Sequence, residues 1–465
     1  MRRFLFVFAL AVGVLALLAA PAFASPKTIC VPYTGKHDYT SEIQKAFDAA
    51  VKAGPGSIVQ LGAGHFYANN IVVTNFDGTF RGAGEGRTVI DTLRGLYPNG
   101  RGVTETGNPG YYLLFFLFRG GDVRVSDLGF DITATSPAET WNDYGTPADF
   151  LGSMVGVLGN ASSSFDRVSF TAGAGNDNGY NADEDLYVSG IAPLDANDNP
   201  ITFAATTGID SVRNCSFSGN AGVQVNGLTA GRLTVCGNVA NTLWPCCLVD
   251  DSARGSAIAI SHNQMQGQHW YDVVVYQGFM ADAGAGAPVP PLPAPRVTIA
   301  DNHLEGTGQA GSVGLIDDSR LSSTVSHLDA VVVDNDFVLD TDNYGIGESF
   351  TQNICFMNNR MSGSAVEGMG LGDDQLPDGS YFPVSGWKII GNDFRDLTTS
   401  VASVYLGMGT THCLVVGGPR PTTVLDNGTD NTLINVTPIS DPPAPAAKPM
   451  NSLKQMKQLK GMMRP

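Results

Sequence analysis

Charged residues are scarce in this chain, and basic ones are the scarcer kind. They make up 15% of 465 residues, with 27 Lys and Arg against 44 Asp and Glu, for a formal net charge of -17. A protein that follows a phosphate backbone needs Lys and Arg to displace counterions, so the composition argues against nucleic acid as a partner. The shortage of helix-forming Lys and Glu beside 56 Gly residues also excludes a helical bundle.

Long hydrophobic runs are absent except at the start. Arg2 and Arg3 precede an apolar run that extends to Ala20, and Ala22-Phe23-Ala24 follows before Ser25. This is the layout of a secretory signal peptide. We therefore expect residues 1–24 to be removed and the protein to be exported, to the extracellular space or the periplasm. No later run is long enough to cross a bilayer, so no membrane span is expected.

Cysteine is infrequent and odd in number, with seven residues. No two form a Cys-x-x-Cys, which argues against a zinc or redox site built on that motif. The adjacent Cys246 and Cys247 fit disulfide geometry with each other only under strain. Export leaves either of them able to pair with Cys236, and the odd count leaves at least one thiol unpaired within the chain.

What the sequence does contain is a degenerate repeat. Short apolar stretches run into an Asn that is followed two residues later by an apolar residue, at Asn238, Asn263, Asn302, Asn335, Asn359 and Asn392. Cys215-Ser-Phe217 fits the same column, and Leu128-Gly-Phe130 and Val168-Ser-Phe170 are looser copies. The base period is about 24 residues, interrupted by insertions.

A unit of this length, with about three short strands and no helical periodicity, cannot bury its apolar face alone and must stack on its neighbours. Stacked coils pair about 4.8 Å apart, and an Asn at the same place in each coil can bond to the next. The repeat therefore predicts an all-β parallel solenoid with an internal asparagine ladder.

Helical periodicity is confined to a segment before the strands. Between Ser41 and Ala53 one apolar stripe is formed by Ile43, Ala46, Phe47, Ala50 and Val51. Ser41 and Gln44 fit a capping box at the start of this helix. Since a solenoid exposes its core at each end, we expect the helix to cover the N-terminal end.

The predicted organisation has four parts. Residues 1–24 are the signal peptide, 25–56 an N-terminal segment with the capping helix, 57–437 the β-helix of about ten coils, and 438–465 a Pro/Ala linker with a basic tail. In the tail, Lys454, Lys457 and Lys460 stand among Leu453, Met456 and Leu459. This pattern is typical of a disordered or weakly helical end, with a membrane-binding or partner-binding helix as the alternative.

Three stretches carry a family resemblance: the run from Ser41 to Ala50, the run from Gly56 to Tyr67, and Gly78-Thr-Phe-Arg-Gly-Ala-Gly-Glu-Gly-Arg-Thr-Val-Ile90. They are similar to the opening of pectate-lyase-like (pectin lyase fold) proteins, and with the Asn coils the likeness covers roughly residues 38 to 437. It implies a single-stranded right-handed parallel β-helix. The superfamily includes lyases, hydrolases, epimerases, esterases and non-catalytic proteins, so it implies no single reaction.

Acidic residues recur in three successive coils. The patterns are Gly314-Leu-Ile-Asp317, Gly345-Ile-Gly-Glu348 and Gly370-Leu-Gly-Asp373. If the coils stack in register, Asp317, Glu348 and Asp373 form a column, which Gln277 continues in polar form and which Asp318 and Asp374 flank. Crowded carboxyls provide a protonated acid beside an ionised base, which glycosidic cleavage requires. Acids at unrelated exposed turns are the alternative.

The same carboxylates suit calcium. A calcium-dependent lyase would hold the ion with Asp317, Asp318, Glu348 and Asp373, and Arg320 is the candidate base. Polygalacturonases, which are also β-helical, combine an Asn-x-Asp, an Asp-Asp pair, a Gly-His-Gly and an Arg-x-Lys. Asp373-Asp374 resembles only the second of these, and this chain has neither Gly-His-Gly nor Arg-x-Lys. Calcium is therefore a candidate cofactor that the sequence does not require.

Aromatic residues near these coils suggest a sugar-binding groove. Trp270, Tyr271 and Tyr344 follow their Asn anchors at similar distances. Their rings can stack on sugar faces beside Gln277, with core packing as the alternative. The leading hypothesis is a secreted hydrolase or lyase that acts on a polysaccharide or cell-surface glycan. The alternatives are a non-catalytic glycan-binding protein and a structural surface protein, and the sequence implies no particular oligomeric state.

Overall fold

The computed structural model describes most of the chain between Ser25 and Ser440. The ranges are 25–68, 71–92, 113–133, 151–158, 162–172, 184–189, 208–219, 221–226, 231–250, 256–268, 271–277, 296–308, 311–317, 328–341, 344–349, 351–372, 379–381 and 383–440. The predicted signal peptide and the basic tail lie outside them. No helix within these ranges is long and apolar enough to cross a membrane.

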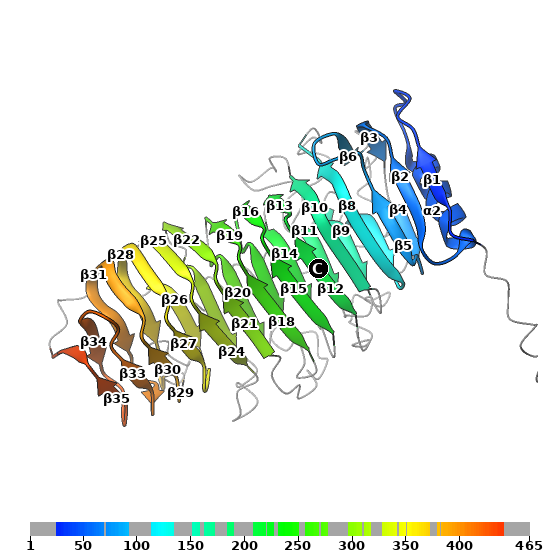
Figure 1. The fold of residues 1–465 in the computed structure, drawn as a ribbon. Helices are drawn as coiled ribbons and strands as arrows, with labels where there is room; N and C mark the ends of the chain where they lie inside the picture. Colours follow the sequence, from blue (N-terminus) through cyan, green and yellow to red (C-terminus); the bar gives the residue numbers. More distant parts are fainter. Residues whose placement is uncertain are drawn as a thin grey trace, which may run out of the picture.

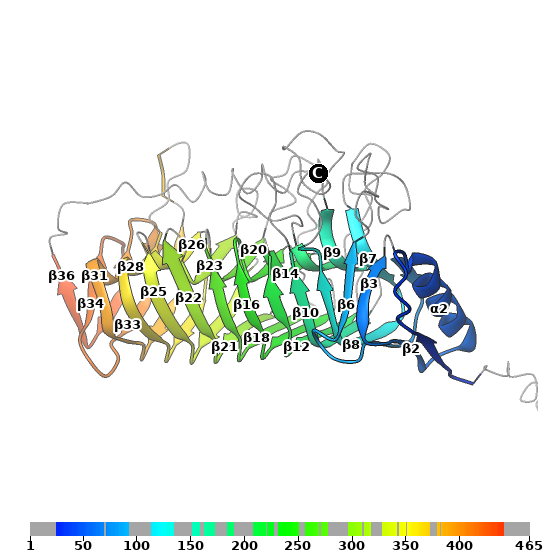
Figure 2. The ribbon, with the colours of Figure 1, turned by 90° about the horizontal axis from the view of Figure 1, so that it is seen from above.

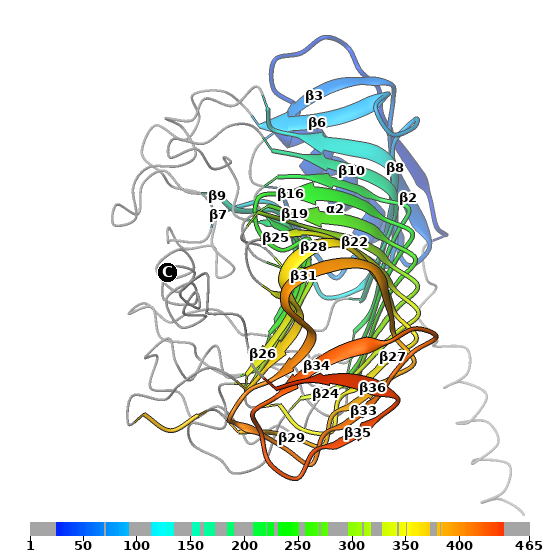
Figure 3. The same cartoon turned by 90° about the vertical axis from the view of Figure 1, so that its left-hand side faces the viewer.

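Each strand pairs in parallel with the strand one coil further along the chain. These pairings give three elongated faces, A, B and C, which follow one another around every coil. Figures 1 and 2 show the coils stacked along one axis, and Figure 3 shows the faces in cross-section. The protein is a right-handed parallel β-helix, which confirms the parallel solenoid predicted from the repeat and the fold implied by the family resemblance.

The strand bounds for each face are as follows. Face A contains β3 (Gly64–Ala68), β6 (Thr88–Thr92), the ends of β8 (Asp122–Asp131) and β10 (Ser162–Thr171), β13 (Ser216–Ser218), β16 (Val239–Thr242), β19 (Gln264–Gly267), β22 (His303–Gly308), β25 (Asp336–Thr341) and the starts of β28 (Arg360–Leu371) and β31 (Asp393–Leu406). Face B contains β4 (Ile71–Thr74), β7 (Leu113–Arg119), β9 (Leu151–Leu158), β11 (Glu184–Ser189), β14 (Ala221–Asn226), β17 (Cys247–Asp250), β20 (Val273–Gln277), β23 (Val313–Asp317), β26 (Tyr344–Ser349), the ends of β28 and β31, β34 (Thr422–Asp426) and β36 (Val436–Ile439). Face C contains β1 (Thr28–Val31), β2 (Ser57–Leu61), β5 (Gly78–Arg81), the starts of β8 and β10, β12 (Ile209–Arg213), β15 (Arg232–Cys236), β18 (Ala257–Ser261), β21 (Arg296–Ala300), β24 (Asp329–Val333), β27 (Cys355–Met357), β30 (Lys388–Ile390), β33 (Leu414–Val416) and β35 (Thr432–Ile434). A small extra pair joins β29 (Val384–Ser385) to β32 (Thr410–Thr411).

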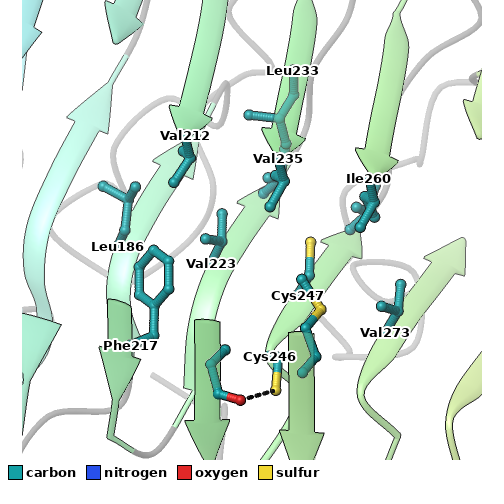
Figure 4. Packing of buried hydrophobic residues seen from close by; sticks show 14 of the residues in the cluster. Leu186, Val212, Phe217, Val223, Leu233, Val235, Cys246, Cys247, Ile260 and Val273 are labelled. Atoms are coloured by element: carbon teal, nitrogen blue, oxygen red, sulfur yellow. Dashed lines mark hydrogen bonds between the residues drawn. The ribbon is translucent and has the colours of Figure 1, made fainter. Parts of the chain in front are cut away.

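The inside of the coils is one continuous apolar core, because alternate residues of every face point inward. Figure 4 shows part of it, with Val212, Val235 and Ile260 following one another along the axis. The apolar anchors of the repeat are in register, as predicted. Phe130 stacks on Phe170 at a ring-centroid distance of 5.5 Å, and Phe170 on Phe217 at 5.0 Å. Such stacks stabilise the coils beyond the area that they bury.

The predicted asparagine ladder is present at the corner between faces C and A. From Asn263 to Asn392, each ladder Asn accepts two hydrogen bonds at Oδ1, from the backbone N–H and the side-chain amide of the Asn one coil earlier. Asn302, for example, accepts from Asn263 at 3.0 and 2.9 Å. Its own Nδ2 donates to Ile260 O and to Asn335 Oδ1, each at 2.9 Å. The ladder thus satisfies polar groups that the corner would otherwise bury unpaired.

The residue before each ladder Asn turns the corner. It has a left-handed backbone, with φ between 52° and 69°, in Asn214, Gly237, His262, Asp301, Asp334, Asn358 and Gly391. Gly, Asn, Asp and His are the residues that tolerate this conformation best. The sequence therefore contains a signal for the corner, in the residue that precedes the repeat Asn.

Helix α2 (Thr40–Ala53) lies at the N-terminal end of the stack (Figure 1). Its Phe47 packs on Phe76, Phe80, Phe116 and Phe118 at centroid distances between 5.0 and 6.0 Å. The predicted capping box is wrong, since the helix begins at Thr40, its N-cap Tyr39 makes no side-chain capping bond, and the N–H of Thr40 donates to Asp38 Oδ1 at 2.8 Å. Gln44 instead exchanges hydrogen bonds with the backbone of Val72 in β4, because that strand edge offers it both a donor and an acceptor.

All seven cysteines are free. The pairing of Cys236 with Cys246 or Cys247, which the sequence left open, is therefore not formed. The reason is topological, since β15, which ends at Cys236, lies on face C and the other two thiols lie at face B. Cys246 and Cys247 are buried among aliphatic side chains (Figure 4), and burial raises the pKa of each thiol, for Cys247 to about 12. Buried thiols of this kind act as small apolar groups.

Candidate functional site

Face B differs from the other faces because apolar side chains are buried on its outer side as well. Along β20, Val273 and Val275 belong to the core, whereas Val274 and Tyr276 belong to a separate cluster outside it. This cluster, called the outer cluster below, contains Trp244, Leu248, Tyr271, Val274, Tyr276, Ile316 and Tyr344. On face C, by contrast, the outward residues of β15 are exposed or half-buried.

A column of glycines forms a floor beneath two rings of the outer cluster. The strand register pairs Gly314 with Gly347 and Gly347 with Gly370. A Cβ on Gly314 would lie 2.6 Å from the Tyr271 ring, and one on Gly347 would lie 2.0 Å from the Tyr271 hydroxyl oxygen. The ring of Tyr271 therefore extends across the next two coils, and only glycine leaves room for it.

Tyr344 and Glu367 share this floor. They are paired in the register of β26 and β28. A Cβ on Gly370 would lie 2.7 Å from Glu367 Oε2 and 3.1 Å from Tyr344 Cδ1. Tyr271 is only 7% exposed and so is a packed ring, whereas Tyr344 is half-buried and keeps accessible surface. The described part of face B thus presents an aromatic ring beside a carboxylate.

The register supports only part of the predicted acid column. Gln277 pairs with Asp317, as predicted. Glu348, however, pairs with Leu315, so it lies two positions before the place level with Asp317. The expectation that the three acids form one column is wrong for Glu348. The cause is the glycine floor, which aligns Gly347, and not Gly345, with Gly314 and Gly370.

The remaining predicted site residues fall outside the described residues. These are Trp270, Asp318, Arg320, Asp373 and Asp374. The backbones of Gln277, Asp317 and Glu348 are described but their side chains are not. The catalytic, sugar-binding and calcium-binding roles of all these residues stay predictions. Within the described ranges, no group of three or more His, Cys, Asp or Glu side chains could hold a metal ion.

Two buried acids lie at the inner corner where face B begins. Asp272 accepts a hydrogen bond from the N–H of Gly267 and so closes the turn that leads to Tyr271. Both carboxyl oxygens of Asp185 are buried without a hydrogen-bond partner among the described residues. Burial raises the pKa of both carboxyls well above the usual range, because a low-polarity environment disfavours the charged form. No pattern in the sequence indicates this, because acids near turns are usually exposed.

The outer side of face A carries a polar ladder that the sequence reasoning missed. The register places Gln264, His303, Asp336, Arg360 and Asp393 in one column. His303 Nδ1 lies 3.0 Å from Asp336 Oδ2, and its Nε2 lies 3.1 Å from Glu305 Oε1. The contact with Asp336 links neighbouring coils, whereas Glu305 belongs to the same strand as His303. Because these side chains are exposed by a third or more, we assign the ladder to strand register and not to chemistry.

Comparison with known proteins finds likeness at the level of fold. No family model matches the chain, and no curated protein does. Similar solved structures include the A-module of the Azotobacter vinelandii mannuronan C-5 epimerase AlgE6, at 15% identity and a TM-score of 0.47 over 87% of this chain and 97% of that one. Others are a family 28 exopolygalacturonase from Yersinia enterocolitica, at 12% identity and 0.45 over 88% and 76%, and a polygalacturonase from Erwinia carotovora, at 12% and 0.34 over 90% and 98%. Likeness at this level carries no argument about an activity.

Proposed function

We propose that this protein is an exported carbohydrate-active enzyme that cleaves a polysaccharide held along the outer side of face B. The observation that carries the proposal is the register of the glycine floor. Asp317 follows Gly314 by three residues, and Asp373 follows Gly370 by three. Asp373 itself lies outside the described residues, just beyond the end of β28 at Leu371. We propose that it comes level with Asp317, so that the two acids form one column, two coils apart.

A separation of two coils is about 9.6 Å along the axis. This is close to the distance of about 6.5–9.5 Å between the two carboxyls of an inverting glycosidase. In the proposed reaction one carboxyl protonates the glycosidic oxygen as the bond to the anomeric carbon breaks. The other takes a proton from the water that attacks that carbon. The net change is the addition of one water molecule across the bond.

The described residues of face B provide the binding surface for the sugar chain. Tyr344 has an accessible ring, and Glu367 provides a hydrogen-bond acceptor beside it on the floor. Rings of this kind stack on the apolar faces of sugars, while carboxylates bond to sugar hydroxyls. The packed ring of Tyr271 supports this surface from below. This is a narrower role than direct contact with the sugar, because little of that ring is exposed.

Elimination is the alternative reaction on the same surface. Asp317, Asp318, Glu348 and Asp373 would then hold Ca²⁺. Arg320 would remove the proton next to a uronate carboxyl as the bond from the adjacent ring carbon to the glycosidic oxygen breaks, and that oxygen would leave with the other sugar and take up a proton from solvent. The double bond that forms makes the product absorb ultraviolet light, and a chelator abolishes the activity. Hydrolysis gives new reducing ends without that absorbance.

The test is a panel of plant and microbial polysaccharides incubated with the purified protein and four variants. We expect D317N and D373N each to lower the rate of cleavage at least 100-fold, since each removes one of the two proton-transferring groups. E348Q should have a smaller effect, because the register sets Glu348 apart from that column. D340N, which changes an exposed carboxylate on β25 of face A, is the matched control.

The outcomes separate the functions. Cleavage that is equally fast in D317N, D373N and D340N would show that the acid pair is not the catalytic centre. Saturable binding without new reducing ends or unsaturated products would identify a glycan-binding protein. No binding at all would leave a structural surface protein.

A further inference from the structure

The two ends of the β-helix are finished differently in the described residues. At the N-terminal end, α2 buries Ile43, Phe47 and Ala50 against the first coils. At the other end the last strands are β35 and β36, which pair only with β33 and β34. No described segment lies beyond them. The end of the stack formed by β35 and β36, which no described residue covers, is called the open face below.

This open face is apolar in part. Leu433 and Val436 pack against the core but are only partly buried, and Ile434 is 44% exposed. The strands of interior coils, such as β18 and β21, bury every second residue. An uncovered core end and two unpaired strand edges favour association with something that covers them.

We propose that the C-terminal segment of this same chain, residues 450–463, docks on the open face as an amphipathic helix. The described chain ends at Ser440, directly after β36 (Val436–Ile439), so the following residues start at the rim of that face. Residues 441–449 are rich in Pro and Ala. An extended Pro-rich chain advances about 3.1 Å per residue, which gives a reach of about 28 Å. The strand β36 has four residues and is only about 13 Å long.

The pattern of the segment matches this position. Leu453, Met456 and Leu459 recur at every third residue and fall on one side of a helix. Lys454, Lys457 and Lys460 lie next to them and form the adjoining side. The last strands and their connections, residues 414–440, contain Asp426 and Asp430 against Arg420 as the single basic residue, so the net charge there is opposite in sign to that of the tail. The helix would cover the C-terminal end as α2 covers the other, and this inference does not depend on the proposed enzymatic activity.

Hydrogen exchange of the full-length protein provides the test. With the tail docked, the backbone amides of β35 and β36 are protected from solvent. We expect the triple variant L453S/M456S/L459S, and a deletion of residues 441–465, to raise the exchange rates of these amides at least 10-fold. The rates in β18 should not change. The matched variant K454Q/K457Q/K460Q keeps the apolar side and should retain most of the protection.

Three results would overturn the proposal. The first is exchange in β35 and β36 that is equally fast in the wild type and the triple variant. The second is a wild-type mass that doubles with concentration while these amides become protected, which would mean that a second copy covers the face. The third is a tail that binds anionic phospholipid vesicles and leaves the amides exchanging freely, which would mean that the basic segment serves a membrane surface.

Discussion

Replacing Asn302 with alanine removes a central member of the asparagine ladder. The change deletes four hydrogen bonds, two accepted from Asn263 and two donated to Ile260 O and Asn335 Oδ1. At about 1 kcal/mol for each bond the loss is about 4 kcal/mol. The buried backbone N–H of Asn263 is also left without its acceptor, which adds to the cost. We therefore expect N302A to lower the free energy of unfolding by about 4–6 kcal/mol.

The position within the ladder should set the size of the effect. Asn238 stands near the N-terminal end, where its Oδ1 accepts only the backbone N–H of Cys215, because Cys has no side-chain amide to donate. N238A should therefore cost about 1 kcal/mol less than N302A. Asn241 is an exposed residue of β16 with a single bond to Gln268, so N241A should change stability by less than about 0.5 kcal/mol.

The assay is urea unfolding followed by circular dichroism, together with hydrogen exchange in β18, β21 and β24. Exchange is needed because a stacked protein can open one group of coils before the rest. The expected result is faster exchange around the mutated coil as well as a lower midpoint. A loss below about 1 kcal/mol with unchanged exchange would refute the view that the ladder holds the coils together.

Three further predictions concern other parts of the fold. Burial raises the pKa of Asp210 from 3.8 to about 6, so its stabilising contribution is present below about pH 4 and is lost as the pH rises through about 6. The stability gain of D210N over the wild type should therefore grow by about 2.4 kcal/mol between pH 4 and pH 7, and a gain that does not vary with pH would contradict this reasoning. G347A should destabilise the protein by about 1–3 kcal/mol in thermal unfolding, since the new Cβ meets the Tyr271 hydroxyl. Adding Y271F should recover part of the loss, and purely additive effects of the two changes would show that this contact is not the cause. F47A should lower the free energy of unfolding by about 3–5 kcal/mol in denaturant, whereas V51A, on the exposed side of the same helix, should lower it by less than about 0.5 kcal/mol. Equal effects of the two changes would mean that α2 is not packed on the first coils.

The sequence was sufficient for the fold because its signals are local and repeat in every coil. Asn238 and Asn263 mark the corner each time, and the side-chain amide of Asn238 donates to Asn263 Oδ1 one coil away. Phe170 and Phe217 lie two residues beyond their corners, so counting from the corner gives the correct register on face A.

The candidate site was harder to predict because face B lies further from the corner. The distance from the ladder Asn to the glycine floor differs between coils, and this made Gly345 appear equivalent to Gly314. The choice of Gly347 depends on the ring of Tyr271, which belongs to an earlier coil. Packing between coils of this kind has no signature within a single repeat.

The proposed cleavage reaction depends most directly on the separation of Asp317 and Asp373. An experimental structure of the D317N variant with a bound oligosaccharide would measure it. We predict side-chain oxygens of residues 317 and 373 about 9–10 Å apart, with a glycosidic oxygen between them and a sugar ring over Tyr344. A separation above about 15 Å, or an oligosaccharide bound on another face, would contradict the proposed function.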